Sequence, residues 1–262
     1  MSRLAFLLAL ALAAPAAAQT TPPAPPASPM AGRIEYLTRF DFGFGMEHLV
    51  SDDNRFVWDA EFGGDLDLID YGLGRLAFTA VYEAILGEEF KAFDPNQGNY
   101  VLAGELSARA GAIEVSGVFH HVSRHLSDRP KRDPVDWNMM GGRIRGRLAR
   151  GGTELEGRAD LRGVIQKTFI DYRWELDADA RAQKALGPRV SVVALGAVRV
   201  LGVDGSRGRG TQHGVRAEGG VRFDGRGAAV ELYAGVERRI DPYQLEFSTA
   251  TWVTTGFRLV GR

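Results

Sequence analysis

Apolar and polar residues alternate along a series of segments from residue 34 to the C-terminus, and turn-forming residues separate these segments. In one segment the two parities differ sharply: Trp58, Ala60, Phe62, Leu66 and Leu68 against Asp59, Glu61, Asp65 and Asp67. A repeat of two places such sets on opposite faces of a β-strand, whereas a helix, at about 100° per residue, would scatter the charges around its circumference. The pattern therefore predicts strands whose two faces meet different surroundings.

About twelve segments of this kind can be delimited. They span residues 34–51, 55–72, 75–87, 98–110, 112–127, 138–149, 152–169, 172–185, 189–203, 213–223, 228–240 and 243–260. An even number of strands, each long enough to cross a bilayer when tilted, is typical of a transmembrane barrel with one face in lipid and the other in a polar lumen. The sequence thus predicts an all-β fold, a transmembrane antiparallel up-and-down β-barrel of about 12 strands over residues 33–262.

The first residues have the features of an export signal. Arg3 supplies a positive start, an apolar run follows, and Ala16-Ala17-Ala18 offers a small-residue cleavage site, so residues 1–18 are predicted to be a signal peptide. Residues 19–32 are rich in proline and predict a disordered leader. Export followed by membrane-spanning strands predicts the outer membrane of a Gram-negative-type bacterium.

The composition narrows the possible functions. A formal net charge of −1 argues against a nucleic-acid partner, and the absence of cysteine excludes disulfides and cysteine-based chemistry. Charged residues make up 25% of the chain and occur with both signs on the inward parity, which favours a narrow lumen filled by ion pairs. Wide aqueous channels belong to barrels of about 16–18 strands, although a narrow pore remains an alternative.

The alternation also predicts which residues pair across neighbouring strands, and the lengths of the connections predict which end of the barrel faces outside. A turn centred on Arg150-Gly151 and another on Gly225-Arg226 predict these cross-strand pairs: Arg147 with Glu154, Arg145 with Glu156, Phe223 with Ala228 and Val221 with Val230. Short connections alternate with longer ones along the chain, as in barrels whose short turns are periplasmic and whose long loops are outside.

Three of the five histidines, His120, His121 and His125, lie within six residues. His121, Ser123 and His125 share one face of a predicted strand, where an imidazole could accept the proton of a hydroxyl if a third group oriented it. Apolar residues earlier in the segment share this parity, so the cluster is predicted to face outward unless a bulge turns it. His121 and His125 would lie about 13 Å apart, at about 3.3 Å per residue, so no metal or other cofactor is predicted.

The His121-Val122-Ser123 sequence resembles the motif of the outer-membrane lipid A 3-O-deacylases, barrels that use a Ser–His–Glu triad facing the lipid. The resemblance implies that His121 is the base and Ser123 the nucleophile, with Asp136 or Asp133 in the acid position. The chain departs from that family at Arg124, where the family usually has asparagine, and in its larger predicted number of strands.

A longer string, His-x-Ser-x-His-Leu-x-Asp from His121 to Asp128, resembles an uncharacterised family of bacterial outer-membrane barrels. That resemblance implies a location without an activity. The leading interpretation is therefore an integral outer-membrane barrel of unassigned activity with a narrow, charge-paired lumen, and the alternative is a lipid A-modifying hydrolase whose site would include His121, Ser123, His125 and Asp136. The non-catalytic alternative is a polar cluster at the membrane rim.

Several partners follow from the same features. Outer-membrane lipid would surround the barrel, and the cationic segments 129–134 and 207–209 are natural partners of lipopolysaccharide phosphates. The final segment resembles the C-terminal strand that the barrel-assembly machinery recognises, although it ends in Gly261-Arg262 instead of an aromatic residue. We expect a monomer.

Overall fold

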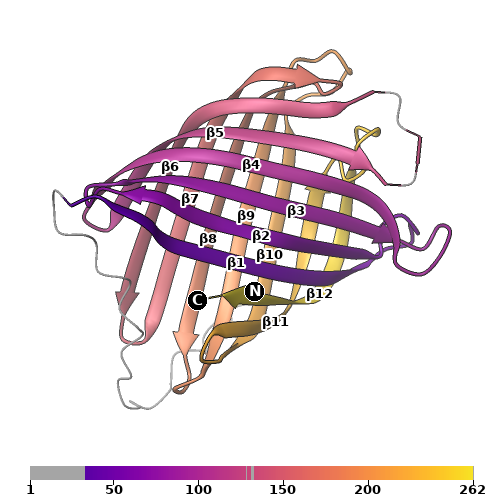
Figure 1. The fold of residues 1–262 in the computed structure, drawn as a ribbon. Coiled ribbons are helices and arrows are strands. Elements are labelled where there is room, and N and C mark those ends of the chain that lie inside the picture. Colours follow the sequence, from indigo (N-terminus) through magenta and orange to yellow (C-terminus); the bar gives the residue numbers. More distant parts are fainter. Residues whose placement is uncertain (1–32, 128, 131–132, 262) are drawn as a thin grey trace, which may run out of the picture.

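The computed structural model describes residues 33–127, 129–130 and 133–261, within which twelve antiparallel strands close into one barrel (Figure 1). The strands are β1 (Glu35–Val50), β2 (Trp58–Asp70), β3 (Arg75–Gly87), β4 (Asp94–Ala110), β5 (Ile113–Leu126), β6 (Val135–Arg150), β7 (Thr153–Thr168), β8 (Tyr172–Ala185), β9 (Val190–Val203), β10 (Gln212–Asp224), β11 (Ala228–Ile240) and β12 (Thr249–Gly261). Each strand pairs with its neighbours in sequence, and β1 pairs with β12. The predicted all-β barrel is confirmed, whereas the predicted signal peptide and leader lie outside the described residues.

Among those residues, no helix is long and apolar enough to span a membrane.

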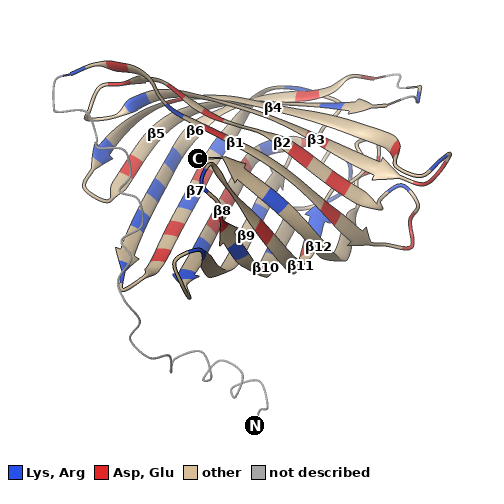
Figure 2. Ribbon diagram, turned by 60° about the horizontal axis from the view of Figure 1, so that its bottom comes forward, with Lys and Arg blue, Asp and Glu red and all other residues tan. Residues whose placement is uncertain are grey.

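The two faces of the barrel wall differ as the sequence pattern predicts. Large apolar side chains are exposed on the outside, among them Phe62, Leu106, Leu161, Leu232 and Val253. Charged side chains of the other parity are buried inside, among them Asp67, Glu105, Arg143, Asp160, Arg162 and Glu231, and Figure 2 shows acidic and basic positions at intervals along the strands. Exposed apolar groups around a charged interior suit a wall that stands in lipid.

The two ends of the barrel differ in the length of their connections. At one end, which we call the short-turn end, the strands are joined by residues 71–74, 111–112, 151–152, 186–189 and 225–227. At the other, the long-loop end, the connections are residues 51–57, 88–93, 127–134, 169–171, 204–211 and 241–248. The predicted alternation holds except at residues 169–171, which form a loop as short as the turns.

At two hairpins the register differs from the predicted one by two residues. The observed pairs are Arg145 with Arg158, Arg147 with Glu156, Phe223 with Val230 and Val221 with Leu232. Gly151 and Gly152 adopt φ of 57° and 71°, the pair of positive values that a type I′ turn needs, so this turn is centred one residue later than predicted. Because the displacement is two residues rather than one, every side chain keeps its predicted face.

The predicted final strand over residues 243–260 is wrong at its start, because β12 begins at Thr249. Residues 241–248, which we call the cap loop, lie instead across the long-loop end of the lumen. Arg124 of β5 donates hydrogen bonds to the carbonyl oxygens of Asp241 (2.8 Å) and Pro242 (2.9 Å), and Gln97 of β4 donates to that of Pro242 (3.0 Å). In the closed strand order β5 is six strands away from β11, so the cap loop reaches the opposite wall.

Apolar side chains pack at the same end of the lumen. One buried cluster, with Leu245 of the cap loop against it, consists of Val122, Val135, Trp137, Met139, Ile170, Tyr172 and Leu201. A second, with Tyr243 of the cap loop against it, consists of Leu49, Phe56, Ile85 and Trp252. The apolar core of this protein is thus a plug at one mouth of the barrel.

We expect purified, folded protein to give no channel events in planar lipid bilayers, because the cap loop and the apolar clusters fill the long-loop mouth. Steady unitary current steps would contradict this account of the lumen and would revive the alternative of a narrow pore.

Candidate functional site

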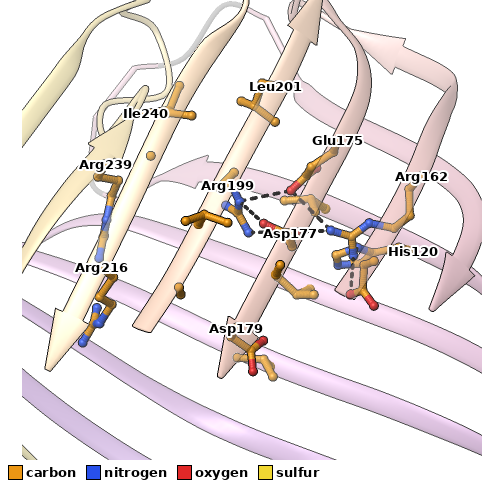
Figure 3. A pocket seen from close by; sticks show the side chains of 18 of the residues that line it. His120, Arg162, Glu175, Asp177, Asp179, Arg199, Leu201, Arg216, Arg239 and Ile240 are labelled. Atoms are coloured by element: carbon orange, nitrogen blue, oxygen red, sulfur yellow. Dashed lines mark hydrogen bonds and ion pairs between the residues drawn. The ribbon is translucent and has the colours of Figure 1, made fainter. Parts of the chain in front are cut away.

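The lumen below the cap loop contains a cavity of about 570 Å³. In Figure 3, His120 of β5 and charged side chains from β7, β8 and β9 meet in it. Arg199 Nε lies 2.7 Å from Asp177 Oδ1 and 3.2 Å from Glu175 Oε1, and Arg162 contacts His120, Glu175 and Asp177. These charged groups therefore bind one another, and their contacts hold the strands around the cavity together.

Ion pairs also tie distant strands together across the lumen. Arg216 of β10 binds Glu47 of β1, with Nη1 and Oε1 2.9 Å apart, although two strands separate β10 from β1. On the other side, Arg143 of β6 lies 2.6 Å from both Asp160 and Glu105. A further cavity of about 1040 Å³ lies toward the short-turn end among such pairs. The inward-facing charged side chains thus join strands that are not neighbours.

The histidine and serine cluster lies on the opposite face of the wall. Val118, His120 and Val122 of β5 are buried, whereas Phe119 of the other parity is exposed. The pairing of β5 with β4 and β6 runs without a bulge. His121, Ser123 and His125 therefore point outward with Phe119, close to the long-loop end.

Two hydrogen-bonded pairs make up the centre of this outward cluster. The Oγ of Ser123 lies 2.7 Å from Nε2 of His125, and Nδ1 of His121 lies 2.7 Å from Oδ1 of Asn138. Asn138 is the direct cross-strand neighbour of His121 on β6. The serine thus has an imidazole partner, and the second imidazole has an amide partner.

The amide of Asn138 continues the chain of hydrogen bonds onto β7. Its Nδ2 donates to Oε1 of Gln166 (2.6 Å), and Nε2 of Gln166 donates to Oδ1 of Asp136 (3.1 Å). Asp136 lies directly opposite Ser123 in the register of β5 and β6. We call these four side chains, His121, Asn138, Gln166 and Asp136, the amide relay.

The predicted site residues are therefore brought together in part. His121, Ser123, His125 and Asp136 occupy one patch of the outer surface, but Asp136 binds Gln166 where the resemblance implies contact with a histidine. Asp133 is exposed in the loop between β5 and β6, and Asp128 lies outside the described residues. Asn138 and Gln166 are absent from the predicted site, because nothing in the sequence pairs these neutral amides with His121.

Aromatic rings border the patch on the β4 side. Tyr100 lies opposite Ser123 in register, and its ring meets that of His125 edge-on at 5.4 Å between centroids. The row continues through Tyr82 to Phe62, with centroids 4.8 and 5.2 Å apart. Aromatic side chains of this kind favour the boundary between lipid tails and head groups. The cluster is thus suited to that boundary.

Within the described part of the chain, no group of three or more histidine or carboxylate side chains is placed to hold a metal ion.

Solved structures share the fold of this chain, although no protein-family model and no curated protein matches it. Outer membrane phospholipase A from Escherichia coli is 14% identical, with 87% of this chain and 98% of that chain covered and a TM-score of 0.52. The corresponding enzyme from Salmonella typhi, a dimer with bound calcium, is 13% identical over 85% and 90% of the two chains, with the same TM-score of 0.52. LpxR from Salmonella typhimurium is 8% identical, with coverage of 84% and 99% and a TM-score of 0.49. The chain thus has the fold of the bacterial outer-membrane β-barrels.

Removal of one buried cation from the lumen should test the ion pairs. We expect Arg143→Met to lower the free energy of unfolding by about 3–5 kcal/mol, because it leaves the buried carboxylates of Asp160 and Glu105 without this partner. The measurement is urea unfolding in lipid vesicles, followed by tryptophan fluorescence.

The matched control is Arg150→Met at the exposed end of β6, which should change that free energy by less than about 0.5 kcal/mol. Equal effects of the two substitutions would contradict a structural role for the buried pairs.

Proposed function

We propose that this protein is an integral outer-membrane enzyme that hydrolyses acyl esters of membrane lipid, with Ser123 as the nucleophile. The observation that carries the proposal is the hydrogen bond between Ser123 and His125 beside an oriented His121, all on the lipid-facing surface. At the level of the head groups, which the neighbouring aromatic row favours, an outward hydroxyl beside two imidazoles lies within reach of lipid ester groups. The same residues are those that serine-based acyl transfer requires.

His121 is the better candidate for the general base. Its Nδ1 faces Oδ1 of Asn138, which can only accept, so Nδ1 carries the proton and Nε2 is left to accept another. Ser123 lies between the two histidines on one strand face, and the proposal requires a rotation about its χ1 that turns Oγ from His125 toward His121. His125 then holds the hydroxyl in the resting state.

The reaction would follow the usual course of serine acyl transfer. The Ser123 oxygen attacks the ester carbonyl while Nε2 of His121 takes the hydroxyl proton, and the departing alcohol receives that proton. Water then attacks the acyl-enzyme with the same nitrogen as base, which releases the fatty acid and restores Ser123. Asn138 keeps the ring oriented through both steps.

Glycerophospholipid is the substrate class that we favour. One of the matching structures is an active-site mutant of the E. coli phospholipase A in which an asparagine is replaced, and here an asparagine holds the histidine. The ester groups of such lipids lie at the level of the head groups, which the aromatic row also favours. The acyl esters of lipid A are the alternative substrate.

The proposed setting is the outer membrane of a Gram-negative-type bacterium, with the long-loop end outside, insertion by the barrel-assembly machinery, and a single chain as the working unit. Two of the loop arginines that could bind lipopolysaccharide phosphates already have carboxylate partners. Arg209 binds Asp171 and Asp241, and Arg129 binds Asp94 and Glu89. The proposed lipid contact is therefore the outward face of β4 to β7.

We expect purified wild-type protein to release fatty acid from phosphatidylethanolamine vesicles, and the Ser123→Ala variant to release none above background, as measured by mass spectrometry. A parallel reaction on purified lipopolysaccharide distinguishes the alternative substrate.

The control is His213→Ala, which removes an outward-facing histidine of β10 that lies outside the cluster and should leave the rate unchanged. The proposal would be contradicted if folded wild-type protein released no fatty acid from either lipid.

A further inference from the structure

We infer that Asp136 and Gln166 are positioning residues that set the direction of the amide relay and thereby the tautomer of His121. This inference rests on the proposed function, because it explains how the base of that reaction is kept able to accept a proton. The observations are the three consecutive hydrogen bonds from His121 to Asp136, which cross β5, β6 and β7.

A primary amide has a donor end and an acceptor end of nearly the same shape. An asparagine beside an imidazole can therefore accept from a protonated Nδ1, or it can turn and donate to a bare Nδ1. In the second arrangement the ring proton sits on Nε2, which then cannot take the proton of Ser123. Asn138 alone does not select between these two arrangements.

A carboxylate differs from an amide because, when ionised, it only accepts. Asp136 therefore requires Gln166 to present its Nε2, and the Oε1 of Gln166 then faces Asn138. Asn138 must in turn donate through Nδ2, which leaves its Oδ1 toward His121. The direction set at Asp136 thus reaches the imidazole through two amides.

The strand geometry keeps the members of the relay aligned. Asp136 and Asn138 are two residues apart on β6 and share its outward face, and Gln166 of β7 is the cross-strand neighbour of Asn138. Gln166 Nε2 also lies 3.5 Å from the hydroxyl of Thr168, a weaker second acceptor on the same side. Because a hydroxyl can also donate, only the contact with Asp136 fixes which end of the Gln166 amide faces Asn138.

The Asp136→Asn substitution tests the inference with little change of shape. It replaces the acceptor-only end by an amide, so the relay loses its fixed direction. We expect kcat for fatty acid release to fall about 10- to 100-fold with KM within about twofold, a smaller loss than the roughly 10⁴-fold effect of a wrong tautomer in a Ser-His-Asp triad. Asp52→Asn, in the exposed loop between β1 and β2 at the same end of the barrel, is the control and should change neither constant.

A double variant should restore the direction. When Asp136→Asn is combined with Gln166→Glu, the acceptor-only carboxylate occupies the middle of the relay, accepts from both sides, and again forces Asn138 to turn its oxygen to His121. We expect kcat within about threefold of wild type. A loss caused only by a damaged surface would not be repaired by a second substitution.

The tautomer of His121 can be read without any activity, from ¹⁵N chemical shifts of labelled protein in micelles. We expect Nδ1–H in wild type and in the double variant, and a mixture of tautomers in Asp136→Asn. Unchanged shifts and unchanged kcat in Asp136→Asn would overturn the inference while leaving the proposed function intact. Wild type that is inactive on both lipids but has the Nδ1–H tautomer would overturn the proposed function alone.

Discussion

Contact with hydrocarbon on one face is the constraint on which the rest of this structure depends. Lipid offers no hydrogen bonds, so the backbone must satisfy its own donors and acceptors, and a closed sheet does this without leaving an edge. The twelve strands accordingly pair all around the barrel, and apolar side chains cover its outside. Everything charged is confined to the lumen, to the loops, or to a small number of outward positions.

That confinement decides how the interior is built. Charges of both signs are buried in the lumen, and a buried charge is stable only when it is paired. Arg216 and Glu47 illustrate the result, since their contact joins strands that are not neighbours. The apolar core is displaced to the long-loop mouth, where Leu245 and Tyr243 of the cap loop pack against it.

Most of the fold could be predicted from the sequence, since the alternation in a segment such as Trp58 to Leu68 assigns a face to each residue directly. The details that failed depend on other physics. Register depended on which residues adopt positive φ, as Gly151 and Gly152 do. The alternation of Tyr243, Leu245 and Phe247 predicts a strand over the cap loop. In the structure Tyr243 and Leu245 pack instead against the apolar clusters at the mouth of the lumen.

The candidate site could be predicted only in outline. Three clustered polar residues on a lipid-facing parity were visible in the sequence, whereas their partners were not. Asn138 is a neutral amide 17 residues from His121, and only the register of β5 and β6 makes it the partner of that imidazole. The sequence predicts Asp136 as part of the site. In the structure it is linked to His121 only through the amides of Gln166 and Asn138, an arrangement that depends on how the strands pair.

The central claim is that an outward-facing hydroxyl on this wall is a nucleophile. The most direct measurement is covalent labelling of the folded protein in lipid vesicles with a long-chain alkyl fluorophosphonate, followed by mass spectrometry of its peptides. The account predicts an adduct at Ser123 and none at other outward hydroxyls such as that of Thr255. No adduct at Ser123, or equal labelling of the two residues, would contradict it.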